Sequence, residues 1–212
     1  MDGKRASKRR LRSRRIAAVL AAGAVLGVGA IGTIAAWTDN EEATGSFGAS
    51  IFDTESQSAG SPAYASRPTA PGNVLTFNAT AMSPGVSSYA YLNIRTTAAT
   101  TVGGTVALTA ITPTGALAPA LEYRMVRMAS ASPTSTCAAA AFGGTPVFIA
   151  GGASSYLAVT QVPASPIAST LLAAAGTPLG FCVEVRVQST AANSYQGATA
   201  TVQWSFTATS AS

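Results

Sequence analysis

The chain alternates hydrophobic and polar positions most clearly near its C-terminus. In residues 180–187 and 198–208, a large apolar side chain occupies every second position over most of the segment. The apolar positions are Phe181, Val183, Val185, Val187, Val202, Trp204 and Phe206. A period of two is typical of a strand with one face in a core and the other toward solvent. We therefore predict two strands, joined by a turn at residues 193–197.

Weaker patterns of the same kind predict further strands upstream. These candidate strands are residues 45–55, 74–79, 89–96, 105–111, 121–128, 145–150 and 155–162. Pro84-Gly85 fits a type II turn, because Pro presets φ and Gly accepts a positive φ. Gly103-Gly104 predicts a hairpin between residues 89–96 and 105–111.

Two segments do not fit a strand pattern. Residues 57–71 are rich in Ser, Ala and Pro and predict a loop. Residues 169–176 contain Leu-Leu-Ala-Ala-Ala-Gly and predict a turn or two of helix that Gly176 ends. Many short strands with turns between them predict an all-β fold, an antiparallel β-sandwich of jelly-roll-like form.

The N-terminus has a different pattern. Residues 16–36 carry no charge, and eight Lys or Arg residues precede them within residues 4–15. This is the layout of an export signal, because the basic segment stays on the cytoplasmic side while the apolar segment enters the bilayer. We therefore predict a signal peptide helix in residues 1–36, an N-terminal strand and linker in 37–72, and the sandwich domain in 73–212.

Two other interpretations of the N-terminus stay open. Arg14-Arg15 would fit a twin-arginine signal, although the usual Phe-Leu does not follow it. The apolar run is also long enough to span a bilayer as an uncleaved anchor, since a helix rises about 1.5 Å per residue and the hydrocarbon core is about 30 Å thick. Trp37 would then lie at the membrane interface.

Removal of the signal peptide reverses the net charge. Of 13 basic residues, eight precede Ile16, which leaves five Arg against seven acidic residues and a net charge of −2. The high isoelectric point of the whole chain is therefore no evidence for nucleic-acid binding, which requires clustered Lys and Arg on the folded part. The exported part is poor in charge and rich in Ala, Thr, Ser and Gly, which favours short strands over amphipathic helices.

The chain has two cysteines, Cys137 and Cys182. In an exported protein an even pair most simply forms one disulfide bond. Two unpaired, buried thiols are the alternative.

Candidate catalytic and metal-binding residues are scarce. Histidine is absent, which excludes a Ser-His-Asp triad, a Cys-His pair and a histidine zinc site. One acidic group lacks the spacing of a calcium loop, so we interpret it as a solvated segment: Asp39, Glu41, Glu42, Asp53 and Glu55. Tyr64, Tyr89 and Tyr91 could contact sugars, but tyrosines on strands more often pack. We predict that the protein is not an enzyme and has no metal or cofactor.

Blocks at both ends of the chain resemble secreted proteins of the TasA/camelysin type. The first block is Ala35-Ala36-Trp37-Thr38-Asp39, followed by Thr-Gly-Ser-Phe-Gly-Ala-Ser-Ile-Phe-Asp at residues 44–53. In that family a SipW-type signal peptide ends in Ala, an aromatic residue, Ser/Thr/Asn and Asp. A segment of the form Asn/Ser-x-Phe-x-Ala-Gly-x-Leu-Asp-Leu follows it. Ser50 stands where that family usually has Gly. The C-terminal blocks are residues 82–85, 181–185, 193–197 and 204–208.

The resemblance implies a maturation route and a function. Signal peptidase would cleave between Ala36 and Trp37. The product would be secreted or associated with the cell surface, and it would contact the membrane through its signal peptide alone. The family implies a subunit of extracellular, biofilm-type matrix fibres that self-assembles or joins other matrix subunits. The N-terminal strand would complete the sheet of a neighbour, with Phe47, Ile51 and Phe52 as the strand-donation residues. The alternative is a monomeric cell-surface adhesion or binding domain, held by an uncleaved anchor.

Overall fold

The computed structural model describes residues 45–46, 48–70, 72–77, 82–129 and 137–212. The predicted signal peptide helix, with Ala36 and Trp37 at its end, lies outside these residues, and so does Phe47. The chain divides into two compact units, Met1–Phe47 and Gly48–Ser212. All the strands described below belong to the second unit. In the part of the chain that the structure describes, no helix is long and apolar enough to cross a membrane.

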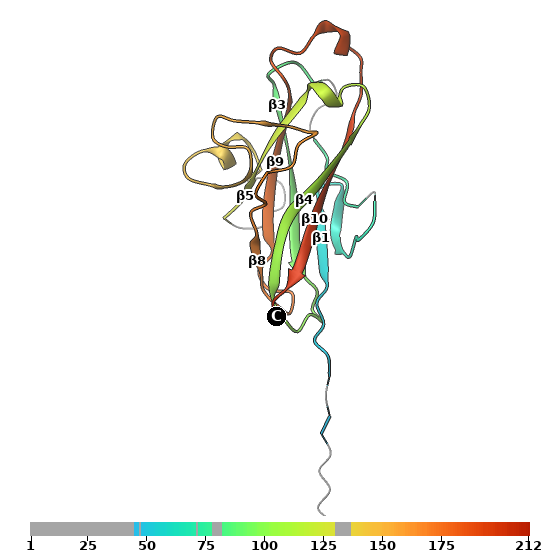
Figure 1. Ribbon diagram of the computed structural model, residues 1–212, viewed down its shortest axis with the longest axis vertical. Helices are drawn as coiled ribbons and strands as arrows, with labels where there is room; N and C mark the ends of the chain where they lie inside the picture. Colours follow the sequence, from blue (N-terminus) through green and yellow to red (C-terminus); the bar gives the residue numbers. More distant parts are fainter. Residues whose placement is uncertain (1–44, 47, 71, 78–81, 130–136) are drawn as a thin grey trace, which may run out of the picture. The chain divides into compact units, whose positions relative to one another are not determined.

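The second unit is an all-β sandwich of two antiparallel sheets, which confirms the predicted fold class (Figure 1). The larger sheet has seven strands in the order β2-β1-β3-β9-β5-β6, with β7 also paired to β5. Its strands are β1 (Thr54–Ser58), β2 (Ser61–Ala65), β3 (Ser87–Thr96), β5 (Leu121–Arg127), β6 (Val147–Ala150), β7 (Leu157–Ala158) and β9 (Leu179–Val187).

The smaller sheet has three strands in the order β10-β4-β8. They are β4 (Gly104–Thr114), β8 (Ser169–Leu171) and β10 (Thr201–Ser210). In the described parts of the connections there are three short 3₁₀ helices: η1 (Ala118–Ala120), η2 (Ala139–Phe142) and η3 (Asn193–Tyr195). Because the sheets differ so much in width, the smaller one cannot cover the whole inner face of the larger one.

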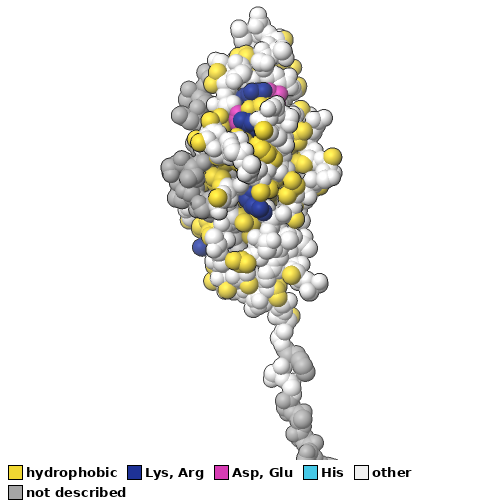
Figure 2. All heavy atoms as spheres, turned by 90° about the vertical axis from the view of Figure 1, so that its left-hand side faces the viewer, with side chains coloured by type: hydrophobic (Ala, Val, Ile, Leu, Met, Phe, Trp, Pro, Cys, Tyr) yellow, Lys and Arg dark blue, Asp and Glu magenta, His cyan; other side chains and the backbone are white. Residues whose placement is uncertain are grey.

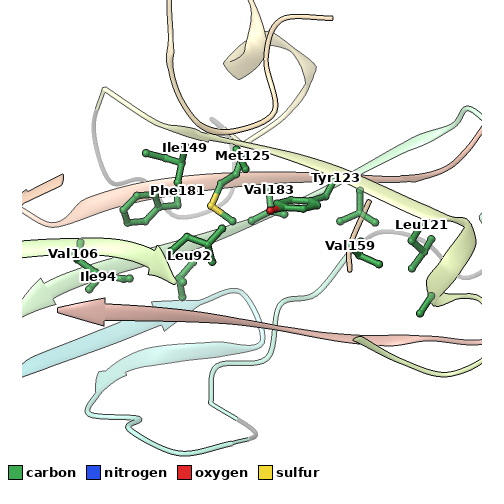
Figure 3. Close-up of a cluster of buried hydrophobic side chains, with 14 of the residues drawn as sticks. Leu92, Ile94, Val106, Leu121, Tyr123, Met125, Ile149, Val159, Phe181 and Val183 are labelled. Carbon is green, nitrogen blue, oxygen red and sulfur yellow. The ribbon is translucent and has the colours of Figure 1, made fainter. Parts of the chain in front are cut away.

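The core lies between the two sheets, and β9 is central to it. β9 pairs with β3 on one side and β5 on the other. Its alternate residues Phe181, Val183, Val185 and Val187 are all at most 4% exposed. Figure 3 shows side chains from β3, β5 and β9 directed into one shared layer, with Tyr123, Met125 and Phe181 among them. The alternation predicted for residues 121–128 and 180–187 is thus confirmed.

The smaller sheet follows the predicted alternation with one irregularity. The register between β4 and β10 shifts between Ser205 and Phe206, so that Trp204 pairs with Ile111 while Phe206 pairs with Leu108. A bulge of this kind places an extra residue in one strand and changes which residues face inward. Consequently β4 directs Val106 and Leu108 inward in its first half and Ile111 in its second half.

The Pro-Gly turn is confirmed. The N–H of Val86 donates to the carbonyl of Ser83 at 3.1 Å, and Gly85 has a φ of +77°. Pro at the second position and a positive φ at the third define a type II turn. The turn is fixed to the sheet, because the N–H of Gly85 donates to the carbonyl of Val187 at 2.8 Å.

The predicted hairpin between residues 89–96 and 105–111 is wrong. β3 pairs with β1 and β9 in the larger sheet, whereas β4 pairs with β8 and β10 in the smaller one. The connection therefore crosses from one sheet to the other. Position 104 requires glycine, because a Cβ there would clash with the ring of Phe52 at 2.7 Å and with the carbonyl of Thr209 at 2.2 Å.

Three local predictions in the first half are also wrong. Residues 45–46 and 48–53 form no strand, and the first strand starts at Thr54. The predicted loop at 57–71 contains the end of β1 and all of β2, because these strands pair with each other and β1 pairs with β3. Residues 74–77 form no strand either. The segment that we assigned to an N-terminal strand and linker therefore supplies two strands of the larger sheet.

The predicted helix in residues 169–176 is a strand followed by a tight turn. β8 pairs with β4, which satisfies its backbone and buries Ser169 and Leu171. Ala174 and Ala175 both have a φ of 53°, which a right-handed helix cannot accommodate. Their N–H groups donate instead to the carbonyls of Thr100 and Thr97.

Candidate functional site

The outer face of the larger sheet carries three ion pairs between directly opposite residues of neighbouring strands. Arg95 pairs with Glu55, Arg186 with Glu122, and Arg124 with Glu184, with N–O distances of 2.6–2.7 Å. The register places each acid opposite its base, so the sequence alternation brings them together on one face. Such cross-strand pairs stabilise a sheet modestly when they are exposed.

Glu184 differs from the other acids because it is 1% exposed. Its carboxylate accepts hydrogen bonds from Arg124 Nε at 2.7 Å, from the Tyr156 hydroxyl at 2.6 Å and from the Ser87 hydroxyl. Arg186 stacks over the Tyr156 ring, with its Cζ 3.5 Å from the ring centroid. A carboxylate with this many donors is fully satisfied, so the cluster is a structural ion pair rather than a reactive site.

The connection between β5 and β6, described from Cys137 onward, packs against this face and forms a second, smaller core. Phe142 from η2 packs with Val126 and Cys182, and its ring centroid lies 6.0 Å from that of Tyr89. The disulfide bond between Cys137 and Cys182 joins this connection to β9. The predicted disulfide between Cys137 and Cys182 therefore fastens this connection to the face that carries the Arg124–Glu184 ion pair.

Removal of the disulfide bond should destabilise the protein. The bridge closes a loop with a sequence separation of 45 residues, which in the chain-entropy model contributes about 4 kcal/mol. We expect Cys137→Ser/Cys182→Ser to lower the free energy of unfolding by about that amount, measured as a lower urea midpoint. Thiol labelling of the wild type in denaturant without reductant is the check, and two labelled cysteines in the unreduced chain would contradict the bridge.

The pKa of Glu184 gives a pH prediction. Burial raises this pKa, but hydrogen bonds from Ser87, Tyr156 and Arg124, together with the Arg124 charge, outweigh burial and leave the pKa below its ordinary value. The unfolded chain then binds the proton more readily, so the contribution of Glu184 is present above the ordinary carboxyl pKa and is lost as the pH falls through the lowered one.

Urea unfolding at pH 7 and at pH 3 tests this. Stability should fall between the two values, and Glu184→Gln should reduce the size of that fall because Gln does not titrate. An unchanged pH dependence in the variant would show that Glu184 does not contribute to it.

A second feature lies between the sheets, on the side where β1 and β10 face each other. A cavity of about 1150 Å³ opens there, which we call the groove. Its walls are Thr54 and Ser56 of β1 and Val202, Trp204 and Phe206 of β10. Trp204 and Phe206 face the core as predicted, yet neither is fully buried, because the space beyond them is unfilled.

One edge of β10 forms the rim of the groove. Among the described residues β10 pairs only with β4, so its other edge has no strand partner. An edge strand presents a row of N–H and C=O groups that another strand can pair with. The groove therefore combines a free strand edge with an apolar wall.

Residues 73–77, which we call the covering segment, lie across the groove. Leu75 and Phe77 are half-buried and pack against the core, together with Met82. The ring of Phe77 lies 6.1 Å from that of Trp204. The groove nevertheless keeps two buried polar atoms without a partner, Asn73 Oδ1 and Trp204 Nε1. Such groups are rare in native interiors and call for an explanation.

The predicted strand-donation residues have different environments. Ile51 is 50% exposed, and its backbone is held by Thr101, whose N–H donates to the Ile51 carbonyl at 2.9 Å. Phe52 packs against the core of its own chain and lies over Gly104. Phe47 lies outside the described residues. Ile51 and Phe52 are thus attached to their own sandwich.

The three tyrosines that we considered for sugar binding all pack. Tyr91 is 5% exposed, Tyr89 contacts Phe142, and the Arg95 guanidinium lies 3.9 Å from the centroid of the Tyr64 ring. Figure 2 shows Lys and Arg atoms on one face as small separate groups, some of them beside Asp or Glu atoms. Within the described part of the chain, no three His, Cys, Asp or Glu residues come together as metal ligands do.

The groove is the candidate functional site, because it combines a cavity, an apolar wall and a strand edge without a partner among the described residues. Sequence reasoning identified Trp204 and Phe206 as core residues but missed the groove and the covering segment. The available signal was the apolar spacing of Leu75 and Phe77, which we interpreted as a strand. Comparison with protein-family models and with curated proteins found no match to this sequence.

Proposed function

We propose that the protein is an exported structural subunit that assembles into extracellular fibres by strand donation. The observation that carries this proposal is the unfilled strand position beside β10, where a free edge borders an apolar groove. A strand added there would pair with the backbone of β10 and direct alternate side chains toward Trp204 and Phe206. One such strand would also reduce the difference in width between the two sheets.

The donor would be the N-terminal segment that precedes Ile51. Residues 37–50 would reach about 46 Å if extended at ~3.3 Å per residue, whereas the ten residues of β10 span about 33 Å. Ile51 and Phe52 anchor the base of this segment to its own sandwich. The donated part is therefore shorter than the sequence pattern indicated, and Phe47 is its one large apolar residue beyond Trp37.

Two further observations support an exported subunit. The disulfide bond between Cys137 and Cys182 is compatible with an oxidising, extracellular environment. The signal-like N-terminus and the resemblance of the terminal blocks to TasA/camelysin-type proteins agree with that location. In this proposal, cleavage after Ala36 frees the donor segment, so export precedes assembly.

Deletion of residues 37–50 should abolish fibre formation. The truncated chain keeps both sheets and the anchors at Ile51 and Phe52, so it should remain a folded monomer with an acceptor groove and no donor. Electron microscopy and size-exclusion chromatography with light scattering measure the two properties.

A substitution pair within the donor provides the matched control. Phe47→Asp should prevent assembly, because it would place an unpaired charge in an apolar groove, whereas Ser46→Asp at the alternate position should not. Fibres formed by the truncated chain as readily as by the intact one would rule out strand donation. A mature chain that stays monomeric at every concentration would favour the adhesion-domain alternative.

A further inference from the structure

The covering segment has the side-chain pattern of a strand but lacks strand partners. Val74 and Thr76 are exposed, whereas Leu75 and Phe77 are half-buried, which is the alternation of an extended chain with one apolar face. No strand is formed at these residues. The pattern that led us to predict a strand there is therefore real, although the backbone pairing is missing.

The segment is held mainly through side chains. The Ser58 hydroxyl donates to the carbonyl of Val74 at 2.7 Å, and the N–H of Val74 donates to the Ser61 hydroxyl at 3.2 Å. The Asn73 amide donates to the Ser56 hydroxyl. All three partners belong to the hairpin of β1 and β2, and the net contribution of each such hydrogen bond to stability is small. The edge of β10 takes no part in these contacts.

The apolar side chains of the segment lie where those of an added strand would lie. Phe77 contacts Trp204, and Leu75 packs against the same core cluster, so both shield the groove from water. Asn73 Oδ1 and Trp204 Nε1, which both belong to residues that line the groove, remain buried without hydrogen-bond partners. The segment thus fills the groove incompletely, in apolar volume and in hydrogen bonds.

We propose that the covering segment is an internal substitute for the donated strand, which closes the groove in the free subunit and leaves it when a neighbour binds. This inference rests on the proposed function. It defines the ligand of the groove as an extended peptide with apolar side chains two residues apart, one of them large. Residues 44–50 of a second copy present Phe47 and Ala49 at that spacing.

Replacement of the covering segment by a donated strand has a measurable consequence for the affinity of the groove for the donor. A site that is open for only a fraction of the time binds its ligand more weakly by that fraction. Weakening the covering segment should therefore strengthen donor binding, which is the opposite of what the loss of an ordinary binding residue does.

Peptide binding to residues 48–212 tests the proposal, because this unit contains both sheets. The probe is a peptide of residues 44–50, titrated by calorimetry against three forms of the protein. Leu75→Ser/Phe77→Ser should bind it about tenfold more tightly or better. Val74→Ser/Thr76→Ser changes the exposed positions of the same segment and should bind like the wild type. Equal affinity of all three forms would overturn the covering role, and no binding to any form would overturn strand donation itself.

Hydrogen exchange on the unsubstituted unit gives a second readout that does not depend on the stability of a variant. When the peptide binds, amides of β10 should exchange more slowly and those of residues 73–77 more quickly. Slower exchange in β10 with unchanged exchange in residues 73–77 would show that the segment stays in place. Unchanged exchange in both would mean that no strand is added at β10.

Discussion

Replacement of Arg124 by methionine should destabilise the protein by about 3–5 kcal/mol, the usual cost of leaving a buried charge without its partner. Among the described residues, Arg124 is the one cation that donates to Glu184, which is 1% exposed and also accepts from the hydroxyls of Ser87 and Tyr156. The Arg124 guanidinium also lies 4.6 Å from the centroid of the Phe142 ring, so its loss loosens the packing of η2 as well. Urea unfolding measures the change.

Two variants distinguish the buried charge from ordinary packing loss. Arg186→Met removes the partner of Glu122, which is still 19% exposed, and should cost about 1 kcal/mol or less. Arg124→Met/Glu184→Leu removes both charges and should recover most of the lost stability, since apolar replacements of buried pairs are often neutral or stabilising. If Arg124→Met costs no more than Arg186→Met, the Glu184 carboxylate is not isolated from water as the structure indicates.

The strands that build the core could be predicted because local and long-range requirements agree in them. β5 and β9 lie inside the larger sheet, with one face on the core and the other on the covered outer face. Their core-facing positions are therefore apolar throughout, and the charges on the outer side pair across the strands. The periodicity of their own residues is therefore sufficient to predict such segments as strands.

Segments at the sheet edges could not be predicted in the same way. Leu171-Leu172-Ala173-Ala174-Ala175 has no period of two, and a short apolar run fits a helix or a buried strand equally well. The first part, up to Leu171, is a strand because it pairs with β4. The second part is a turn because the N–H groups of Ala174 and Ala175 donate to the carbonyls of Thr100 and Thr97. In the same way, the Ser-containing segment of β1 is a strand because its backbone pairs with the edge of β3.

The groove depends on information that no single segment contains. Trp204 and Phe206 have the pattern of core residues, and they do face the core. Whether they are buried depends on how many strands each sheet holds, and this follows from the crossing of the chain at Gly103-Gly104. A sequence pattern shows which face of a strand is apolar, but it does not show that the strand position next to it is empty.

Trp204→Ala should abolish donor binding and fibre formation while the fold persists. Trp204 lines the groove and contacts both Phe77 and Tyr123, with ring centroids 6.1 and 6.3 Å away. Because it is only half-buried, its truncation should cost about 1–3 kcal/mol, the ordinary range for a point mutation. This is less than the 3–5 kcal/mol typical of a fully buried aromatic residue. Trp204→Ala should therefore abolish assembly completely while it lowers the free energy of unfolding only modestly.

Phe181→Ala provides the contrast that makes this prediction decisive. Phe181 is 1% exposed, lies on the core face of β9, and packs against Phe206 with ring centroids 5.1 Å apart. Its truncation should cost about 3–5 kcal/mol, yet it leaves the free edge of β10 and the wall at Trp204 in place. Peptide binding below the unfolding midpoint should therefore survive in Phe181→Ala and be lost in Trp204→Ala. The reverse order would place the binding surface inside the core rather than at the groove, and would contradict strand addition at β10.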